Sequence, residues 1–134
     1  MRTLIALAAV TIASACVSGQ AVEVATRPAP TTSADRSLSQ PAIAQDLKDP
    51  SSAQFRGLRT FALGNGERIT CGEVNGKNSF GAYVGFQPFY VRSYKGTVLS
   101  KEAGSPAYGF VSQNIVESCA KAAAGKVTVR ASAY

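Results

Sequence analysis

The polar side chains best suited to binding a ligand gather on one turn, residues 75–79, and on the segment that follows it. The turn carries amide, ammonium and hydroxyl groups, and a tyrosine follows with a glycine two positions away on either side. Hydrogen-bonding groups beside an aromatic ring predict a shallow polar site for a sugar, a peptide or a loop of another protein. The residues predicted to bind are Glu73, Asn75, Lys77, Asn78 and Tyr83.

A purely structural interpretation fits the same residues. Asparagine and glycine supply the backbone angles of tight turns, and glycines within a strand mark close backbone approach or curvature. On this interpretation, residues 75–79 shape the turn and bind nothing. The sequence leaves both interpretations open.

Catalytic chemistry has little support in the sequence. The 134 residues include no histidine, which excludes serine–histidine and cysteine–histidine hydrolases and histidine-ligated metal sites. A glutamate and a lysine on one hairpin could in principle exchange protons, but no second carboxylate or activated nucleophile accompanies Glu73. We therefore predict no catalytic residue, no metal site and no cofactor. An enzyme that acts on the cell wall through Glu73 is the weaker alternative.

The N-terminus has the pattern of an export signal. A basic residue at position 2 precedes the apolar run Leu4–Ala13, which is too short to span a bilayer permanently. Small residues before Cys16 suit a signal peptidase, so residues 1–15 are predicted to be a signal peptide. Cys16 resembles the acylated cysteine of bacterial lipoproteins, although those proteins usually carry leucine where Ala13 stands. We expect an exported, periplasm-facing protein anchored in the outer membrane through a lipid on Cys16. Secretion without that lipid is the alternative.

The number of cysteines agrees with export. The chain has three, and reserving Cys16 for acylation leaves Cys71 and Cys119. Two cysteines in an oxidising compartment are most simply joined in a disulfide. Two separate buried thiols are the alternative.

Residues 16–37 are predicted to be a flexible tether. Their centre is rich in proline, alanine, threonine and serine and has neither a helical nor a strand period. A single folded domain is then expected over residues 38–134. An ordered N-terminal arm is the alternative.

The predicted domain carries the positive charge. Loss of Arg2 with the signal leaves 13 of the 14 basic residues against 8 acidic ones. For an exported protein, the polyanions within reach include phospholipid headgroups and cell-wall polymers. Because the charges are spread along the chain, solubility alone also explains them.

Apolar periodicity and turn residues predict an α+β domain. The expected elements are a short helix at 41–48, strands at 55–63, 68–75 and 80–94, a helix at 105–123 and a last strand at 126–131. A Gly-Asn-Gly turn at 64–66 joins the first two strands. The predicted fold is a small antiparallel meander of three or four strands packed against a short N-terminal helix and a C-terminal helix, with one disulfide.

Alternation along the expected third strand assigns its two faces. The even positions, which include Phe80, Val84 and Phe86, are predicted to face the core and to hold the fold. Tyr83 then lies on the opposite, accessible face. In the C-terminal helix, the residues assigned to the core face are Tyr108, Val111, Ile115 and Cys119.

Two motifs resemble those of a family of small exported proteobacterial proteins and lipoproteins of uncharacterised function. The first is D-P-S-S-A-Q-F at 49–55, and the second is C-G-E-V-N-G-K-N-S-F-G-A-Y-V-G-F at 71–86. The resemblance covers residues 47–89, with a looser match at Cys119, and it does not extend to 126–134. It implies export and the α+β fold but no activity.

These observations predict a non-enzymatic envelope protein that binds an envelope component or another protein. Its contact with the membrane is expected through the lipid on Cys16, and nucleic acid is not an expected partner. The alternative is a periplasmic inhibitor or immunity-like protein that acts on an envelope hydrolase.

Overall fold

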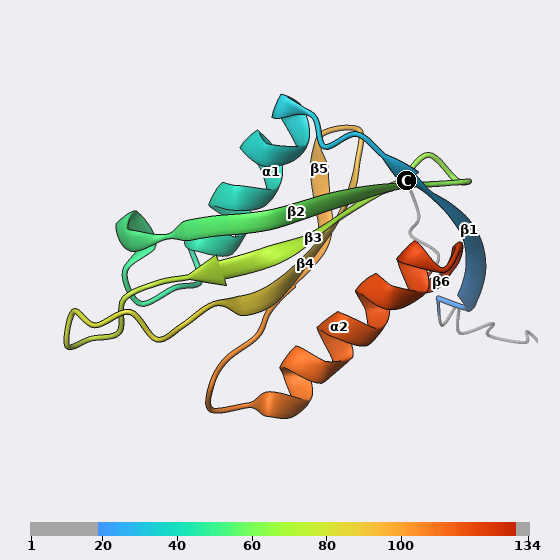
Figure 1. Cartoon of the computed structure of the whole chain (residues 1–134). Coiled ribbons are helices and arrows are strands. Elements are labelled where there is room, and N and C mark those ends of the chain that lie inside the picture. Colours follow the sequence, from blue (N-terminus) through green and yellow to red (C-terminus); the bar gives the residue numbers. More distant parts are fainter. Residues whose placement is uncertain (1–18, 131–134) are drawn as a thin grey trace, which may run out of the picture.

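The computed structural model describes residues 19–130, which form a curled antiparallel sheet of six strands and two helices (Figure 1). The strands lie in the order β5-β4-β3-β2-β1-β6. They are β1 (Ala21–Ala29), β2 (Gln54–Leu63), β3 (Arg68–Asn75), β4 (Gln87–Tyr94), β5 (Thr97–Ala103) and β6 (Lys126–Arg130). The helices are α1 (Ser33–Ala44) and α2 (Gly109–Ala123), with a short 3-10 turn, η1, at Pro50–Ser52.

The two helices cover opposite faces of the sheet, so each face has its own apolar core (Figure 1). The core beneath α1 is formed by Ile43, Val74, Phe89 and Val91. The core beneath α2 is larger, because it also takes in residues of β6 and has Val24 of β1 packed against it. Its buried members are Phe61, Leu63, Ile69, Cys71, Ile115, Cys119, Ala122, Val127 and Val129.

Several predictions from local sequence are confirmed. The second expected strand coincides with β3, the turn at 64–66 connects β2 to β3, and the last strand is β6. Cys71 and Cys119 form the predicted disulfide, which ties β3 to α2 with 6.2 Å between the Cα atoms. The α+β class is therefore correct.

The expected flexible tether is wrong for the part that the structure describes. Most of residues 19–37 lie in β1, which pairs with both β2 and β6, and in the first turns of α1. Val24 packs against the core beneath α2, and the Thr26 hydroxyl donates to the Ala122 carbonyl at 2.6 Å. The folded domain therefore begins near Ala21. The predicted signal peptide and Cys16 lie outside the described residues.

The N-terminal helix begins earlier than expected because of a capping box. The Thr32 hydroxyl accepts from the Asp35 amide, and the Asp35 carboxylate accepts from the Thr32 amide at 2.8 Å. The helix therefore starts at Ser33 and contains Pro41 in its last turns, whereas the sequence analysis predicts a start at Pro41.

The third strand begins at Gln87, because residues 76–86 form a loop. Gly81 and Gly85 in this loop have φ angles of +79° and +97°, which interrupt an extended strand. The assignment of even positions to the core is wrong for Phe80, which is 95% exposed, and for Val84, which is also exposed, whereas Tyr90 packs against the core beneath α2. In β4 the odd positions Phe89 and Val91 pack beneath α1.

The sheet also has more strands than expected. β5 forms a hairpin with β4 through the turn at Lys95 and Gly96, where the sequence analysis predicts no turn and no further strand. Helix α2 begins at Gly109 instead of Ser105, and Tyr108 is exposed instead of facing the core.

An ion pair fixes α1 to the sheet. Arg68 on β3 donates two hydrogen bonds to the buried Asp35 carboxylate, each 2.7 Å long. Burial raises the pKa of Asp35, but the hydrogen bonds from Arg68 and Thr32 lower it by more, so the pKa lies below its ordinary 3.8.

We expect Asp35→Asn to lower the free energy of unfolding by about 1–3 kcal/mol at neutral pH, because the bonds from Arg68 to a charged acceptor are lost. Because the pKa of Asp35 is lower in the folded state than in the unfolded state, this stabilisation is complete at pH values above the unfolded-state pKa. It is lost as the pH falls through the lower, folded-state pKa. Urea unfolding should therefore show the two proteins converging in acid. A difference that stays constant from neutral to acidic pH would contradict the assignment.

Candidate functional site

The loop at 76–86 is held in shape by two of the predicted binding residues. Asn75 Oδ1 accepts from the Gly85 amide at 3.0 Å, and Asn78 Oδ1 accepts from the amides of Phe80 and Ala82 at 3.0 and 3.1 Å. The Asn78 amide also donates to the Ala82 carbonyl at 2.8 Å. Both asparagine side chains therefore support the shape of the loop through hydrogen bonds.

The two sequence motifs meet at the base of this loop. The Lys77 amide donates to Ser52 Oγ at 2.8 Å, and the Ser52 hydroxyl donates to the Asp49 carbonyl at 2.7 Å. Gly76 packs against Leu47, and a Cβ atom at Gly76 would lie 2.9 Å from that side chain. Residues of the first motif thus form the support on which the second motif is built.

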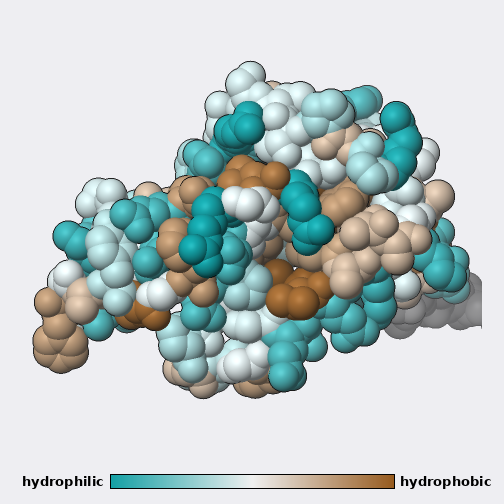
Figure 2. Space-filling model, in the orientation of Figure 1, coloured by the Kyte–Doolittle hydropathy of each residue, from teal (hydrophilic) through white to brown (hydrophobic). Residues whose placement is uncertain are grey.

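The tip of the loop presents an apolar side chain to solvent. Phe80 is almost fully exposed, and Figure 1 shows the loop projecting at the left beyond the ends of β3 and β4. Figure 2 shows apolar atoms at the tip of this projection. A large apolar side chain at such a position has no role in the core.

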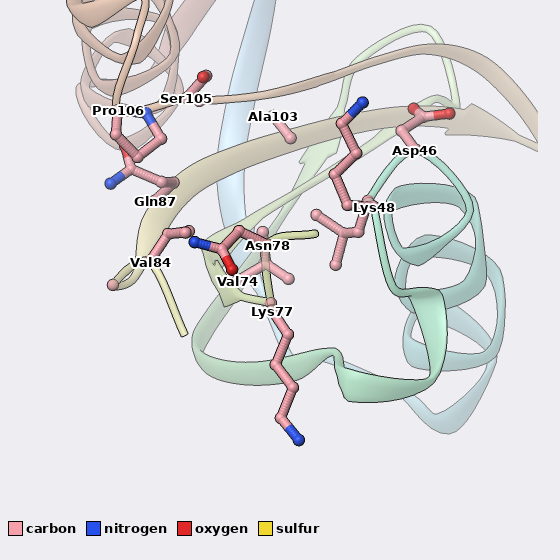
Figure 3. A pocket seen from close by; sticks show the side chains of 14 residues that line it. Asp46, Lys48, Val74, Lys77, Asn78, Val84, Gln87, Ala103, Ser105 and Pro106 are labelled. Carbon is pink, nitrogen blue, oxygen red and sulfur yellow. The ribbon is translucent and has the colours of Figure 1, made fainter. Parts of the chain in front are cut away.

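A pocket of ≈ 390 Å³ lies behind the loop (Figure 3). Three segments enclose it: the chain after α1, the start of the loop with its return into β4, and the connection from β5 to α2. In Figure 3, Asp46 and Lys48 lie on one side of the pocket, and Gln87, Ser105 and Pro106 lie on the other side. Asn78 and Val84 lie closer to Gln87 than to Lys48 in this view. The remaining lining residues are Leu47, Val74, Gly76, Lys77, Gly85, Ala103 and Gly104.

Most charged groups near the pocket are already engaged. Asp46 pairs with Lys101 at 2.7 Å. A hydrogen bond from Ser51 lowers the pKa of Asp49, with smaller contributions from Ser52 and Lys77, which keeps that carboxylate ionised. The pocket thus combines apolar walls with amide and hydroxyl groups, a composition typical of binding sites for small polar segments.

The structure brings together only some of the predicted site residues. Lys77 and Tyr83 face each other across the loop, with the ammonium 5.5 Å from the ring centroid, and Figure 3 shows the Lys77 side chain pointing away from the pocket. Glu73 lies elsewhere. It pairs with Arg56 at 2.8 Å and borders a second hollow of ≈ 310 Å³ beside the disulfide.

No protein-family model, curated protein or solved structure matches the chain. Function is therefore inferred from the chemistry of the surface. Within residues 19–130, no group of three or more Cys, Asp or Glu side chains could hold a metal ion. Neither α1 nor α2 is long and apolar enough to cross a membrane.

The sequence analysis did not identify a pair of exposed aromatic side chains beside the pocket. Tyr108 and Phe110 are both exposed, and their ring centroids lie 6.2 Å apart in an edge-to-face arrangement. They adjoin Ser105 and Pro106, which line the pocket. Phe110 lies outside the apolar stripe of Val111, Ile115 and Cys119, and that mismatch is the signal that could have marked it as exposed.

Proposed function

We propose that this protein is a non-enzymatic binding domain of an exported, periplasm-facing lipoprotein, and that it holds a partner protein with the loop at 76–86 and the adjoining pocket. The observation that carries the proposal is the exposed Phe80 ring on a loop whose shape is fixed by Asn75 and Asn78. Aromatic side chains dominate the energetics of protein interfaces, which makes this ring a natural anchor.

The internal hydrogen bonds of the loop support the proposal. A loop that is ordered before binding loses less conformational entropy when a partner covers it. Tyr83 and Val84 are also exposed beside Phe80, so a partner that receives Phe80 covers further apolar area. The Glu73 carboxylate is held by Arg56 outside the pocket, so we propose no catalytic role for it.

The position of the loop suits a protein anchored at its N-terminus. β1 starts at one end of the sheet, and the loop projects from the other end (Figure 1). The ten residues of β2, which run between these ends, span about 30 Å at about 3.3 Å per residue. An anchor on Cys16 would therefore leave the loop facing away from the membrane.

Replacement of Phe80 tests the proposal. Affinity capture from envelope extracts, quantified by mass spectrometry, should show one protein enriched by the wild-type chain. We expect Phe80→Ala to lower its enrichment by about tenfold or more, because the ring is the proposed anchor. The melting temperature should stay unchanged, since the ring contributes nothing to the core.

Val116→Ala is the matched control. Val116 is an exposed apolar residue on α2, at 57% exposure, and it lies outside the loop and its pocket. Its replacement should leave the enrichment intact. Equal losses in the two variants, or no loss in either, would overturn the proposal.

A second candidate function is inhibition of an envelope hydrolase. The projecting loop with an aromatic tip favours it, because such a shape can enter the substrate cleft of an enzyme. Purified wild-type protein should then reduce the activity of a cell-wall hydrolase in a digestion assay, and Phe80→Ala should not. A partner that is captured but keeps its full activity would exclude inhibition and leave the binding function in place.

A further inference from the structure

The positive charge of the domain is concentrated at the end that carries the start of β1. Strand register places β1, β6, the adjoining ends of β3 and β4 and the β4–β5 turn at this end, and the Asp35–Arg68 ion pair brings the start of α1 there. These segments carry seven basic and three acidic residues, whereas five basic and four acidic residues lie toward the loop end. The remaining pair, Glu117 and Lys121, is neutral as a unit. The β1 end therefore has a net charge of +4 and the loop end one of +1.

All three acidic residues at the β1 end are already paired. Glu23 pairs with Lys126, Asp35 with Arg68, and the buried Glu67 with Arg92. The four basic residues left over are exposed, and within residues 19–130 none of them forms an ion pair with a carboxylate. They are Arg27, Arg36, Lys95 and Arg130.

Two of these cations lie on one face of the sheet. Val24, Val127 and Val129 point toward α2, so the alternate side chains of β1 and β6 point to the other face. Apart from Ala29 at the end of β1, every residue of that other face is exposed, and Arg27 and Arg130 lie near its two ends. Arg130 is opposite Ala21, six residues before Arg27, which places the two cations about 20 Å apart along the strand. We call this surface, formed by Glu23, Ala25, Arg27, Lys126, Thr128 and Arg130, the outer face.

We propose that the outer face rests on anionic phospholipid headgroups. The inference depends on the proposed lipid anchor, because only four residues lie between Cys16 and Ala21, and the five Cα–Cα steps span at most about 18 Å. An anchored domain would thus be held close to the bilayer with its more positive end nearest the headgroups. Basic groups near an anionic membrane surface attract it and strengthen attachment by a lipid chain.

Vesicle binding tests this surface without the lipid. The full chain with Cys16→Ser, which cannot be acylated, is mixed with vesicles of phosphatidylcholine alone or of phosphatidylcholine with phosphatidylglycerol, and the bound fraction is measured by sedimentation. The apolar segment at 4–13 contributes equally in every chain compared. We expect preferential binding to the vesicles that contain phosphatidylglycerol, and weaker binding as salt is added.

Two double variants decide whether the outer face is responsible. In the same Cys16→Ser chain, Arg27→Gln with Arg130→Gln should lower the partition coefficient about 30-fold, since each cation near the surface contributes about fivefold. Lys48→Gln with Arg59→Gln removes the same charge from the loop end and should leave the partition coefficient unchanged. Equal losses in both double variants would show that net charge alone drives binding, and would overturn the proposal.

The outcome is separable from that for the proposed function. If the vesicle experiment fails while Phe80→Ala still abolishes partner capture, only the outer face proposal is wrong. If vesicles bind as expected while partner capture does not depend on Phe80, only the binding function of the loop is wrong. A chain with no preference for phosphatidylglycerol overturns the headgroup contact directly.

Discussion

Replacing Phe89 by alanine should lower the free energy of unfolding by about 3–5 kcal/mol. Phe89 is fully buried in β4 beneath α1, and its ring contacts that of Phe55 edge-to-face with centroids 5.6 Å apart. A Cβ atom on Gly72 would lie 2.8 Å from the ring, so the backbone of β3 packs closely against it. Truncation therefore leaves a cavity that neighbours cannot easily fill, and urea unfolding measures the loss.

The phenylalanines of the loop region are the matched controls. Phe80→Ala should leave stability nearly unchanged, because the side chain is exposed, although the alternating pattern had assigned it to the core. Phe86→Ala should fall between the two, since Phe86 is half-buried and its ring is covered by the Arg56 guanidinium at 3.7 Å. If Phe80→Ala destabilised the domain as much as Phe89→Ala, the loop would be part of the core and would be unavailable to a partner.

Removing the disulfide should cost about 4 kcal/mol of stability in the chain-entropy model, given a sequence separation of 48 residues between Cys71 and Cys119. The bond joins β3 to α2, and both cysteines are buried in the core beneath α2. Cys71→Ala combined with Cys119→Ala removes the bond without leaving a free thiol. The midpoint of urea denaturation should shift accordingly.

Chemical reduction provides an independent measurement of the same quantity. Wild-type protein unfolded in the presence of a thiol reductant should lose as much stability as the double variant, within about 1 kcal/mol. If oxidised wild-type protein and the double variant gave coincident denaturation curves, the disulfide would contribute nothing to the stability of the domain.

Elements with strong local signals could be predicted from the sequence. The Gly-Asn-Gly turn at 64–66 and the apolar pattern of residues 68–75 locate the β2–β3 hairpin without reference to the rest of the chain. The disulfide followed from the number of cysteines once Cys16 was set aside. The residues that determine the hairpin are neighbours in sequence. The disulfide is determined by the number of cysteines that remain to pair.

Elements that depend on distant partners could not be predicted. Val22 and Val24 are the only apolar side chains of β1 that are larger than alanine and proline, and the strand is held by β6 and by a hydrogen bond from Thr26 to Ala122, which lies 96 residues away. The loop at 76–86 has the alternation of a strand. Hydrogen bonds to Asn75 and Asn78 and the positive φ angles of its glycines turn it into a projection instead.

The candidate site was partly predictable for the same reason. Residues 77–83 form a continuous segment, so their common location followed from the turn residues alone. The pocket is assembled from three segments far apart in sequence, and Lys48 and Ser105 join it only because the ends of α1 and β5 meet there. Glu73 precedes this segment within β3, where it pairs with Arg56 on β2 and points away from the site.

The central claim is that a partner protein contacts the end of the domain that carries the loop at 76–86. Crosslinking in cells tests it most directly, with a photoreactive amino acid placed at Ser79 in the loop or at Thr128 on the outer face. Both side chains are exposed, so neither replacement disturbs the core. We predict a defined protein adduct from Ser79 that Phe80→Ala diminishes, and no such adduct from Thr128. The same protein adduct from Thr128, with none from Ser79, would contradict the claim.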